Sequence, residues 1–418
     1  MADDGLIMGR ITDESVGKMR QRIGFPNPTL RHGWLDKPHN IYASYDAFRR
    51  FAIYNGSDNP LFIDEDYPQH TRWGESIAPL GFEGTMGLKR PKAMEVAFER
   101  ETRGALRGVQ LFHSGGENFY FAPITSGQRL YVSRYVSSVE VKESRFGGQS
   151  VIVGNGKCYW NDDDTVLVQG TETFVHVERR RSSAEEATPK AKAEPIVTSY
   201  SDEDLAAIEA AYDAEYRRGA NTWYLEDIAV GTRLPTMVKG PLTITDLINF
   251  FMGAGWYSYG APPFRLAYEN RKRIRGFYSK NEYQAWDTIQ RIHWEASLLK
   301  DVGVAGIYDV AVIRQAMLNH YCNNIAGDDA WVYRVKYDLR KFNYIGDTTW
   351  VNGVVTEARV DQVLGPLVEI DLSGVNQRGE ENIRGSATIL VASRDTGLAK
   401  LPPPAQPTVH RADDWRMT

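Results

Sequence analysis

The sequence lacks the features that mark membrane proteins, secreted proteins and cysteine-rich metal proteins. It has only two cysteines, Cys158 and Cys322, in different halves of the chain, so it predicts neither a disulfide framework nor a thiolate metal site. No apolar run approaches the length of a membrane-spanning helix. The acidic start MADDGLIMGR has no apolar core, which a signal peptide would need. These absences favour a protein of the reducing cytoplasm that does not enter a membrane.

Excess positive charge and nucleotide-binding motifs are also absent. The net charge of −5 predicts no general attraction to nucleic acid or to an anionic membrane. No glycine-rich loop follows a predicted strand, and no group of metal-ligating residues has a typical spacing, so we expect neither a redox cofactor nor a metal. With 418 residues, of which 42% are hydrophobic and 25% charged, the chain is long enough for two or three globular domains.

Two groups of segments alternate apolar and polar residues, as half-buried antiparallel strands do. They are Glu117–Ile124, Gln128–Ser144, Ser150–Trp160 and Thr165–Glu178 in the first half, and Trp331–Tyr344, Thr349–Val360, Leu367–Gly379 and Arg384–Ser393 in the second. Each group follows an amphipathic helical pattern, at Ser44–Tyr54 and at Leu242–Trp256. Between the groups, Glu178–Pro195 is charged and has no aromatic residue, which is typical of a solvated linker.

The two halves repeat the same order of elements. Matched positions in and between the strands are Gly127 with Gly346, Gly147 with Gly365, Asn161 with Asn376, and Gly170 with Gly385. This pattern predicts a domain-sized duplication of one α+β unit, a long helix against a curved antiparallel sheet, with the two sheets joined. The predicted organisation is an N-terminal arm (1–40), a first unit (41–180), a linker and helix (181–221), a second unit (222–396) and a proline-rich tail (397–418).

The stretch Gln290–Asp329 combines a histidine with the start of a long helix. His293 can transfer a proton near neutral pH. A helix with apolar periodicity then follows and ends at Gly327. Asp309 and Val310 lie at its start, where free N–H groups can stabilise developing negative charge. A simpler role for Asp309, which we expect, is to cap this helix.

Several motifs together resemble those of the MaoC-like dehydratase family, which includes the (R)-specific enoyl-CoA hydratases. The similar stretches are Ser57–Asp64, Gly115–Glu117 with Pro123 and Gly127, Tyr224–Asp227 with Gly231, Arg291–His293, Tyr308–Asp309 with Arg314, Gly327–Asp329, and Phe342–Asn343 with Gly346–Thr348. Each motif alone is weak, and the ordered set is what carries the resemblance. It covers residues 40 to 180 and 222 to 395 and implies a double hotdog fold, with two helix-wrapped antiparallel sheets in one chain.

The resemblance also implies where catalysis takes place. The family's catalytic loop has the form Asp-x-Asn-Pro-x-His, and its Asp and His hold a water molecule and transfer protons. In the N-terminal loop Ser57 replaces this Asp and Phe62 replaces this His, so that half is expected to be catalytically empty, with room for a bulky acyl group. In the C-terminal half His293 matches the histidine, and Asp287 is the candidate carboxylate, one residue further away than in the family.

The implied activity is that of an enoyl-CoA hydratase or acyl dehydratase (a hydro-lyase) acting on acyl-CoA thioesters. Candidates for binding the CoA phosphates are Arg271, Lys272 and Arg273, with Arg340 and Lys341 as an equal rival. The expected assembly is a homodimer or higher homo-oligomer. Two alternatives remain open, a non-catalytic acyl-CoA-binding subunit of a hydratase complex and a hotdog thioesterase.

Overall fold

The structure, a computed structural model of the chain, describes residues 9–25, 37–88, 96–143, 149–178, 198–255, 262–299 and 304–405. The N-terminal half contains α1 (Asp13–Gln21), α2 (Tyr45–Tyr54), α3 (Pro60–Ile63), α4 (Val96–Glu101), β1 (Gln110–Tyr120), β2 (Tyr131–Glu143), β3 (Gln149–Trp160) and β4 (Val166–Val177). The C-terminal half contains α5 (Asp202–Asp213), β5 (Met237–Lys239), α6 (Ile244–Ala254), α7 (Phe264–Arg273), β6 (Tyr278–Lys280), β7 (Trp286–Thr288), α9 (Val312–Ala326), β8 (Trp331–Leu339), β9 (Thr349–Asp361), β10 (Gly365–Asn376) and β11 (Glu381–Leu390).

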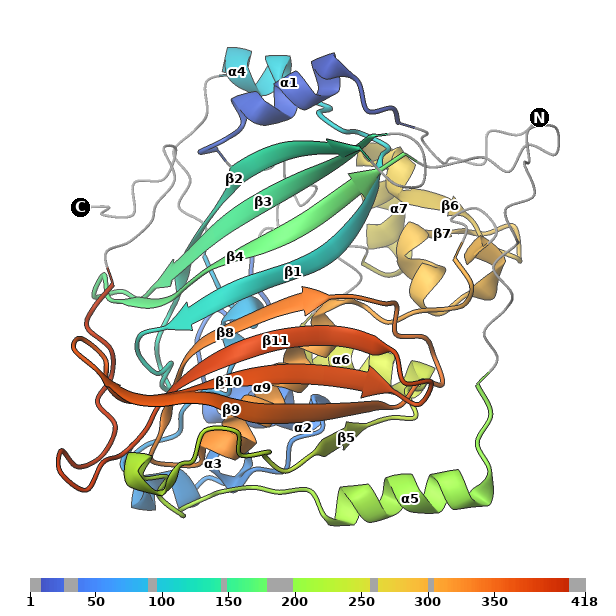
Figure 1. Cartoon of the computed structure of the whole chain (residues 1–418). Helices are drawn as coiled ribbons and strands as arrows, with labels where there is room; N and C mark the ends of the chain where they lie inside the picture. Colours follow the sequence, from blue (N-terminus) through green and yellow to red (C-terminus); the bar gives the residue numbers. More distant parts are fainter. Residues whose placement is uncertain are drawn as a thin grey trace.

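One antiparallel sheet of nine strands runs through both halves, in the order β2-β3-β4-β1-β8-β11-β10-β9-β5 (Figure 1). The halves meet at β1 and β8, which pair from Gly115 with Asp338 to Phe119 with Arg334. The first strand of each group therefore lies at the junction, and the other three strands follow outward in mirrored order. This arrangement confirms the expectation of two α+β units whose sheets are joined.

Matched positions of the duplication have matching local geometry. The side-chain oxygen of Asn161 accepts hydrogen bonds from the N–H groups of Asp163 and Thr165. The side-chain oxygen of Asn376 makes the same turn with Arg378 and Glu380. Gly127 and Gly346 precede β2 and β9 with φ of 87° and 91°, a conformation that favours glycine. Gly147 lies outside the described residues, as do residues 179–195 of the expected linker.

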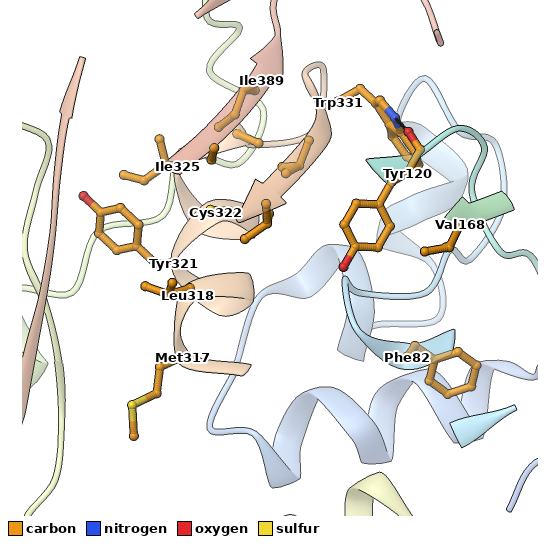
Figure 2. Packing of buried hydrophobic residues seen from close by; sticks show 14 of the residues in the cluster. Phe82, Tyr120, Val168, Met317, Leu318, Tyr321, Cys322, Ile325, Trp331 and Ile389 are labelled. Carbon is orange, nitrogen blue, oxygen red and sulfur yellow. Dashed lines mark hydrogen bonds between the residues drawn. The ribbon is translucent and has the colours of Figure 1, made fainter. Parts of the chain in front are cut away.

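Helix α9 is the central element of the core. It has 15 residues and ends at Gly327, as the sequence predicts. The predicted apolar positions Val310, Ile313, Met317, Leu318 and Tyr321 are all buried. Figure 2 shows the α9 residues Leu318, Tyr321, Cys322 and Ile325 in one cluster with Tyr120, Val168 and Trp331 of the strands. The cluster joins residues of both halves, so the two units share one core.

The N-terminal unit differs from the expected symmetry. Where the C-terminal unit has α9 before its strands, the described part of the N-terminal unit has α4, a helix of six residues. Helix α1 instead packs Val16 and Met19 against residues of β2 and β3 (Figure 1). The predicted strand bounds also differ, because the first long strand begins at Gln110 rather than Glu117 and β8 ends at Leu339 rather than Tyr344. Within the described residues, no helix combines the length and the apolar character that a membrane span requires.

Candidate active site

His293 ends a short 3₁₀ helix, Ile289–His293, that follows the hairpin of β6 and β7. Thr288 caps this helix, since its side-chain oxygen accepts a hydrogen bond from the N–H of Gln290. Arg291 fixes the helix to the hairpin, because its buried guanidinium donates hydrogen bonds to four backbone carbonyls. These belong to Ser279, Lys280, Asp287 and Thr288. The buried Arg291 side chain therefore stabilises the loop that contains His293.

The Arg291→Met variant should loosen this loop. Methionine keeps the apolar stem but leaves four carbonyls without their donor, and it leaves Glu295, now 3.2 Å from the Arg291 Nε, without its counter-charge. Removing one partner of a buried pair costs about 3–5 kcal/mol. We expect faster amide hydrogen exchange across residues 278–295, measured by mass spectrometry. Arg340→Met, which removes a half-exposed arginine paired with Asp338, is the control and should leave that exchange unchanged. Equal protection in both variants would contradict the anchoring role.

The imidazole of His293 has a defined tautomer. Its Nδ1 lies 3.0 Å from the carbonyl oxygen of Tyr308, and a carbonyl can only accept, so Nδ1 carries the hydrogen. In the neutral ring Nε2 then has the free lone pair. The Tyr308 ring packs edge-on to the imidazole with centroids 4.9 Å apart, and Phe342 packs on Tyr308. Burial lowers the pKa of His293, while the Tyr308 carbonyl and the Asp309 carboxylate partly oppose this shift. The lowered pKa keeps the imidazole neutral near pH 7, the state in which a histidine can accept a proton.

Asp309 is the carboxylate that acts electrostatically on His293. Its side chain is buried, its Oδ2 lies 2.9 Å from the Arg314 Nε, and it accepts a hydrogen bond from the Asn343 Nδ2 at 3.2 Å. Its Oδ1 has no partner among the described residues. Burial raises the pKa of Asp309, and Arg314 opposes the rise. A buried carboxyl of this kind can hold a proton that it later donates.

The expectation that Asp309 caps the helix is wrong. The N-cap residue of α9 is Ala311, and in the described part of the chain no side chain caps the first N–H groups of the helix. Asp309 instead turns its carboxylate inward to Arg314, one turn along α9, which also donates to the carbonyls of Lys341 and Asn382. The sequence shows only that Asp309 lies just before a helix. The packing of Arg314 is the reason that Asp309 forms an ion pair and does not cap the helix.

Asp287 lies on β7, and its Oδ1 accepts a hydrogen bond from the N–H of Thr288. Among the described residues, no hydrogen bond or ion pair joins Asp287 to His293. The carbonyl of Asp287 contacts Arg291, so its backbone belongs to the same anchored loop. Its role as the acid partner of His293 stays a prediction.

The two basic groups proposed for CoA lie on different elements. Arg271 packs on the rings of Tyr268 and Trp286, at 5.7 and 4.6 Å, and Lys272 lies 4.1 Å from the Tyr268 ring. Arg273 of the same helix donates to Asn270. Arg340 and Lys341 directly precede Phe342 and Asn343, which contact Tyr308 and Asp309. Which of the two groups binds the CoA phosphates stays a prediction.

The N-terminal loop keeps Asn59 and Pro60 of the motif that it resembles, with Ser57 and Phe62 in place of the acid and the base. Asn59 caps α3 through a hydrogen bond from the Leu61 N–H, and its Nδ2 donates to Asn324 of α9. Ser57 and Phe62, which stand for the catalytic Asp and His, are both buried. This loop therefore packs on the helix of the other half.

Comparison with known proteins finds one family match, in the N-terminal half, and several solved structures of similar fold. Residues 33–169 match the family described as FAS1-like, dehydratase domain region. A solved structure of a MaoC-like dehydratase aligns with a TM-score of 0.56 and 14% identity, covering 89% of this chain and 99% of that chain. A MaoC domain protein dehydratase, reported as putative, from Chloroflexus aurantiacus aligns with a TM-score of 0.47 and 12% identity, covering 86% and 95%.

A conserved hypothetical protein from Mycobacterium tuberculosis with a double hotdog fold aligns with a TM-score of 0.42 and 12% identity, covering 84% of this chain and 93% of that chain. No curated protein matches the sequence of this chain. The resemblance inferred from the ordered motifs is thus supported by a family match in the first half and by the fold of the whole. Residues 33–169 are therefore similar to the FAS1-like dehydratase domain region, and the whole chain, with its two joined α+β units, shares the fold of a solved MaoC-like dehydratase.

Proposed function

We propose that the protein adds water to, or removes it from, the conjugated double bond of an acyl-CoA thioester, with His293 as the base. The observation that carries the proposal is the hydrogen bond that holds His293 on the Tyr308 carbonyl, next to the buried carboxyl of Asp309 and just before the start of α9. The Nδ1–H of His293 is held by the Tyr308 carbonyl, which directs the basic Nε2 away from that anchor. The dehydratase-region match and the shared fold support this class of reaction.

In the hydration direction His293 takes a proton from water, and the hydroxide oxygen bonds to the β-carbon. The electron pair of the double bond moves toward the thioester, whose oxygen becomes negative as the enolate forms. The first N–H groups of α9, near Val310, have no side-chain cap among the described residues and are suited to bind this oxygen. Protonation of the α-carbon by a carboxylic acid completes the addition, and transfer of the proton from His293 to the carboxylate restores the starting state.

Two carboxyl groups are candidates for the acid that protonates the α-carbon. Asp287 is the candidate by sequence position. Asp309 is favoured by its position, because it directly follows Tyr308, whose carbonyl holds His293, and because its carboxyl is buried, which raises its pKa. Arg314 and Asn343 fix the orientation of Asp309, as hydrogen-bonded neighbours do in other proton-transfer sites. In this proposal Arg314 acts as a positioning residue.

The direct experiment is a screen of trans-2-enoyl-CoA thioesters of increasing chain length, followed by loss of the conjugated absorbance. We expect hydration of at least one chain length by the wild-type protein and no release of free CoA. Release of CoA without hydration would favour a thioesterase. Binding of the thioesters without either reaction would favour the non-catalytic subunit, and the assignment of His293 as a catalytic base would then fail.

A further inference from the structure

Helix α7 and strand β7 carry exposed aromatic and basic side chains that form one surface. This α7 surface comprises Phe264, Arg265, Tyr268, Lys272 and Trp286. Phe264 exposes 92% of its surface and Tyr268 exposes 49%. Arg265, Tyr268 and Lys272 follow the i, i+3, i+7 spacing, so they lie on one face of the helix. Aromatic residues and arginine are enriched at protein interfaces, so this composition is typical of a docking surface.

The α7 surface is positively charged. The helix ends in Arg271, Lys272 and Arg273, and Arg265 lies near its start. Within the described residues Arg265 forms no ion pair, and Lys272 lies 3.3 Å from Glu269 in an exposed pair. Exposed pairs of this kind contribute little to stability, so the positive charge remains available to a partner. An acidic partner would fit this surface.

The same chain carries an acidic helix, α5, with an unoccupied face. Its charged residues are all acidic, namely Asp202, Glu203, Asp204, Glu209 and Asp213. Of its 12 residues, Ile208 is the one that is buried. Ala206, Glu209, Ala210 and Asp213 follow the i, i+3, i+4, i+7 spacing and are all exposed, so they form one free face. A helix this short gains most of its stability from packing, which this face does not yet provide.

We propose that α5 of one copy of the chain docks on the α7 surface of a second copy. Figure 1 shows α5 below the sheet and α7 near the upper end of the sheet, so α5 does not reach α7 of its own chain. Because each copy carries both surfaces, a two-fold axis forms the contact twice and closes a dimer. The acids of α5 then face Arg265 and Lys272, and its alanines leave room for the rings of Phe264 and Tyr268. The proposal does not depend on the reaction at His293.

The test reverses the charge on each helix and measures self-association of the full-length protein by sedimentation velocity. Glu209→Lys with Asp213→Lys makes α5 basic and leaves its Ser201 cap in place. Arg265→Glu with Lys272→Glu makes the α7 surface acidic. We expect the wild type to dimerise with a Kd of about 1 μM or tighter. Each double variant should dimerise about a hundredfold or more weakly, because like charges then meet at both contacts.

An equimolar mixture of the two double variants identifies the occupant of the α7 surface. In a mixed dimer, the basic α5 of one variant faces the acidic α7 surface of the other, and the second contact keeps the wild-type charges. The mixture should therefore recover a dimer of wild-type mass. The matched control is Glu65→Lys with Glu75→Lys, which changes the net charge as much as the α5 variant at exposed positions outside both helices. This control should dimerise like the wild type.

A monomeric wild type would overturn the proposal, as would double variants that still dimerise like the wild type. A mixture that stays monomeric would show that α5 of a second copy is not the occupant, and would leave another acidic protein or an anionic membrane. High salt should weaken the wild-type dimer, because exposed charges are screened, and an unchanged Kd would also count against this contact. Thermal melting checks that the variants are folded. Sedimentation is measured without CoA and without turnover, so the result is independent of the proposed hydratase activity.

Discussion

Replacement of His293 by alanine should lower turnover of an enoyl-CoA thioester by about two to four orders of magnitude, the contribution of a general base. Binding of the thioester should change little, because the lost interaction belongs to the transition state. The measurement is the rate of loss of conjugated absorbance at saturating substrate, with affinity measured separately by calorimetry. Wild-type turnover in His293→Ala would contradict the assignment.

The pH profile gives an independent test of the same residue. The base must be neutral to accept a proton and the acid must carry its proton, so activity should rise with pH through the pKa of His293 and fall again as the acid ionises. Burial lowers that pKa below the ordinary 6.5, so the rise should be complete near or below neutral pH. His320→Asn is the matched control, because His320 is also a buried histidine whose pKa is lowered by burial, but it lies on α9 beside Asn324 and Glu215. Replacement of His320 should lower the activity far less than replacement of His293.

Asp309→Asn should lower turnover by about a hundredfold or more if Asp309 is the acid, since asparagine keeps the shape but cannot donate the proton. Asp287→Asn should cost much less in that case. The reverse order would assign the acid role to Asp287, as the sequence alone suggests. Because Arg314 loses its counter-charge in Asp309→Asn, turnover has to be compared well below the melting temperature of the variant.

The pH profile of Asp309→Asn should also shift in a defined direction. The Asp309 carboxylate raises the pKa of His293, so its removal should lower that pKa and move the acidic limb of the residual activity to lower pH. The Asp287→Asn profile should keep the wild-type limb. An unchanged limb in Asp309→Asn would show that the two groups do not interact during turnover.

The sequence by itself predicted the repeated unit, because that unit is encoded in local patterns. The alternation of apolar residues predicted four long strands in each half, and the asparagines at 161 and 376 marked the same turn twice. The apolar period of Ile313, Met317, Leu318 and Tyr321, with Gly327 after it, predicted α9 and its end. These features depend on side-chain periodicity and turn chemistry, which neighbouring residues determine.

The composition of each site, by contrast, was decided by tertiary structure. Asp309 looks like a helix cap in the sequence, but Arg314 and Asn343 draw its carboxylate into a buried ion pair beside His293. Phe62, Trp73 and Trp331 are far apart in the sequence, and only the packing of α3 and α9 near the end of β1 brings them together around one pocket. Local sequence patterns predict helices and strands. Long-range packing determines which polar groups are buried, and buried polar groups have to form hydrogen bonds or ion pairs with one another.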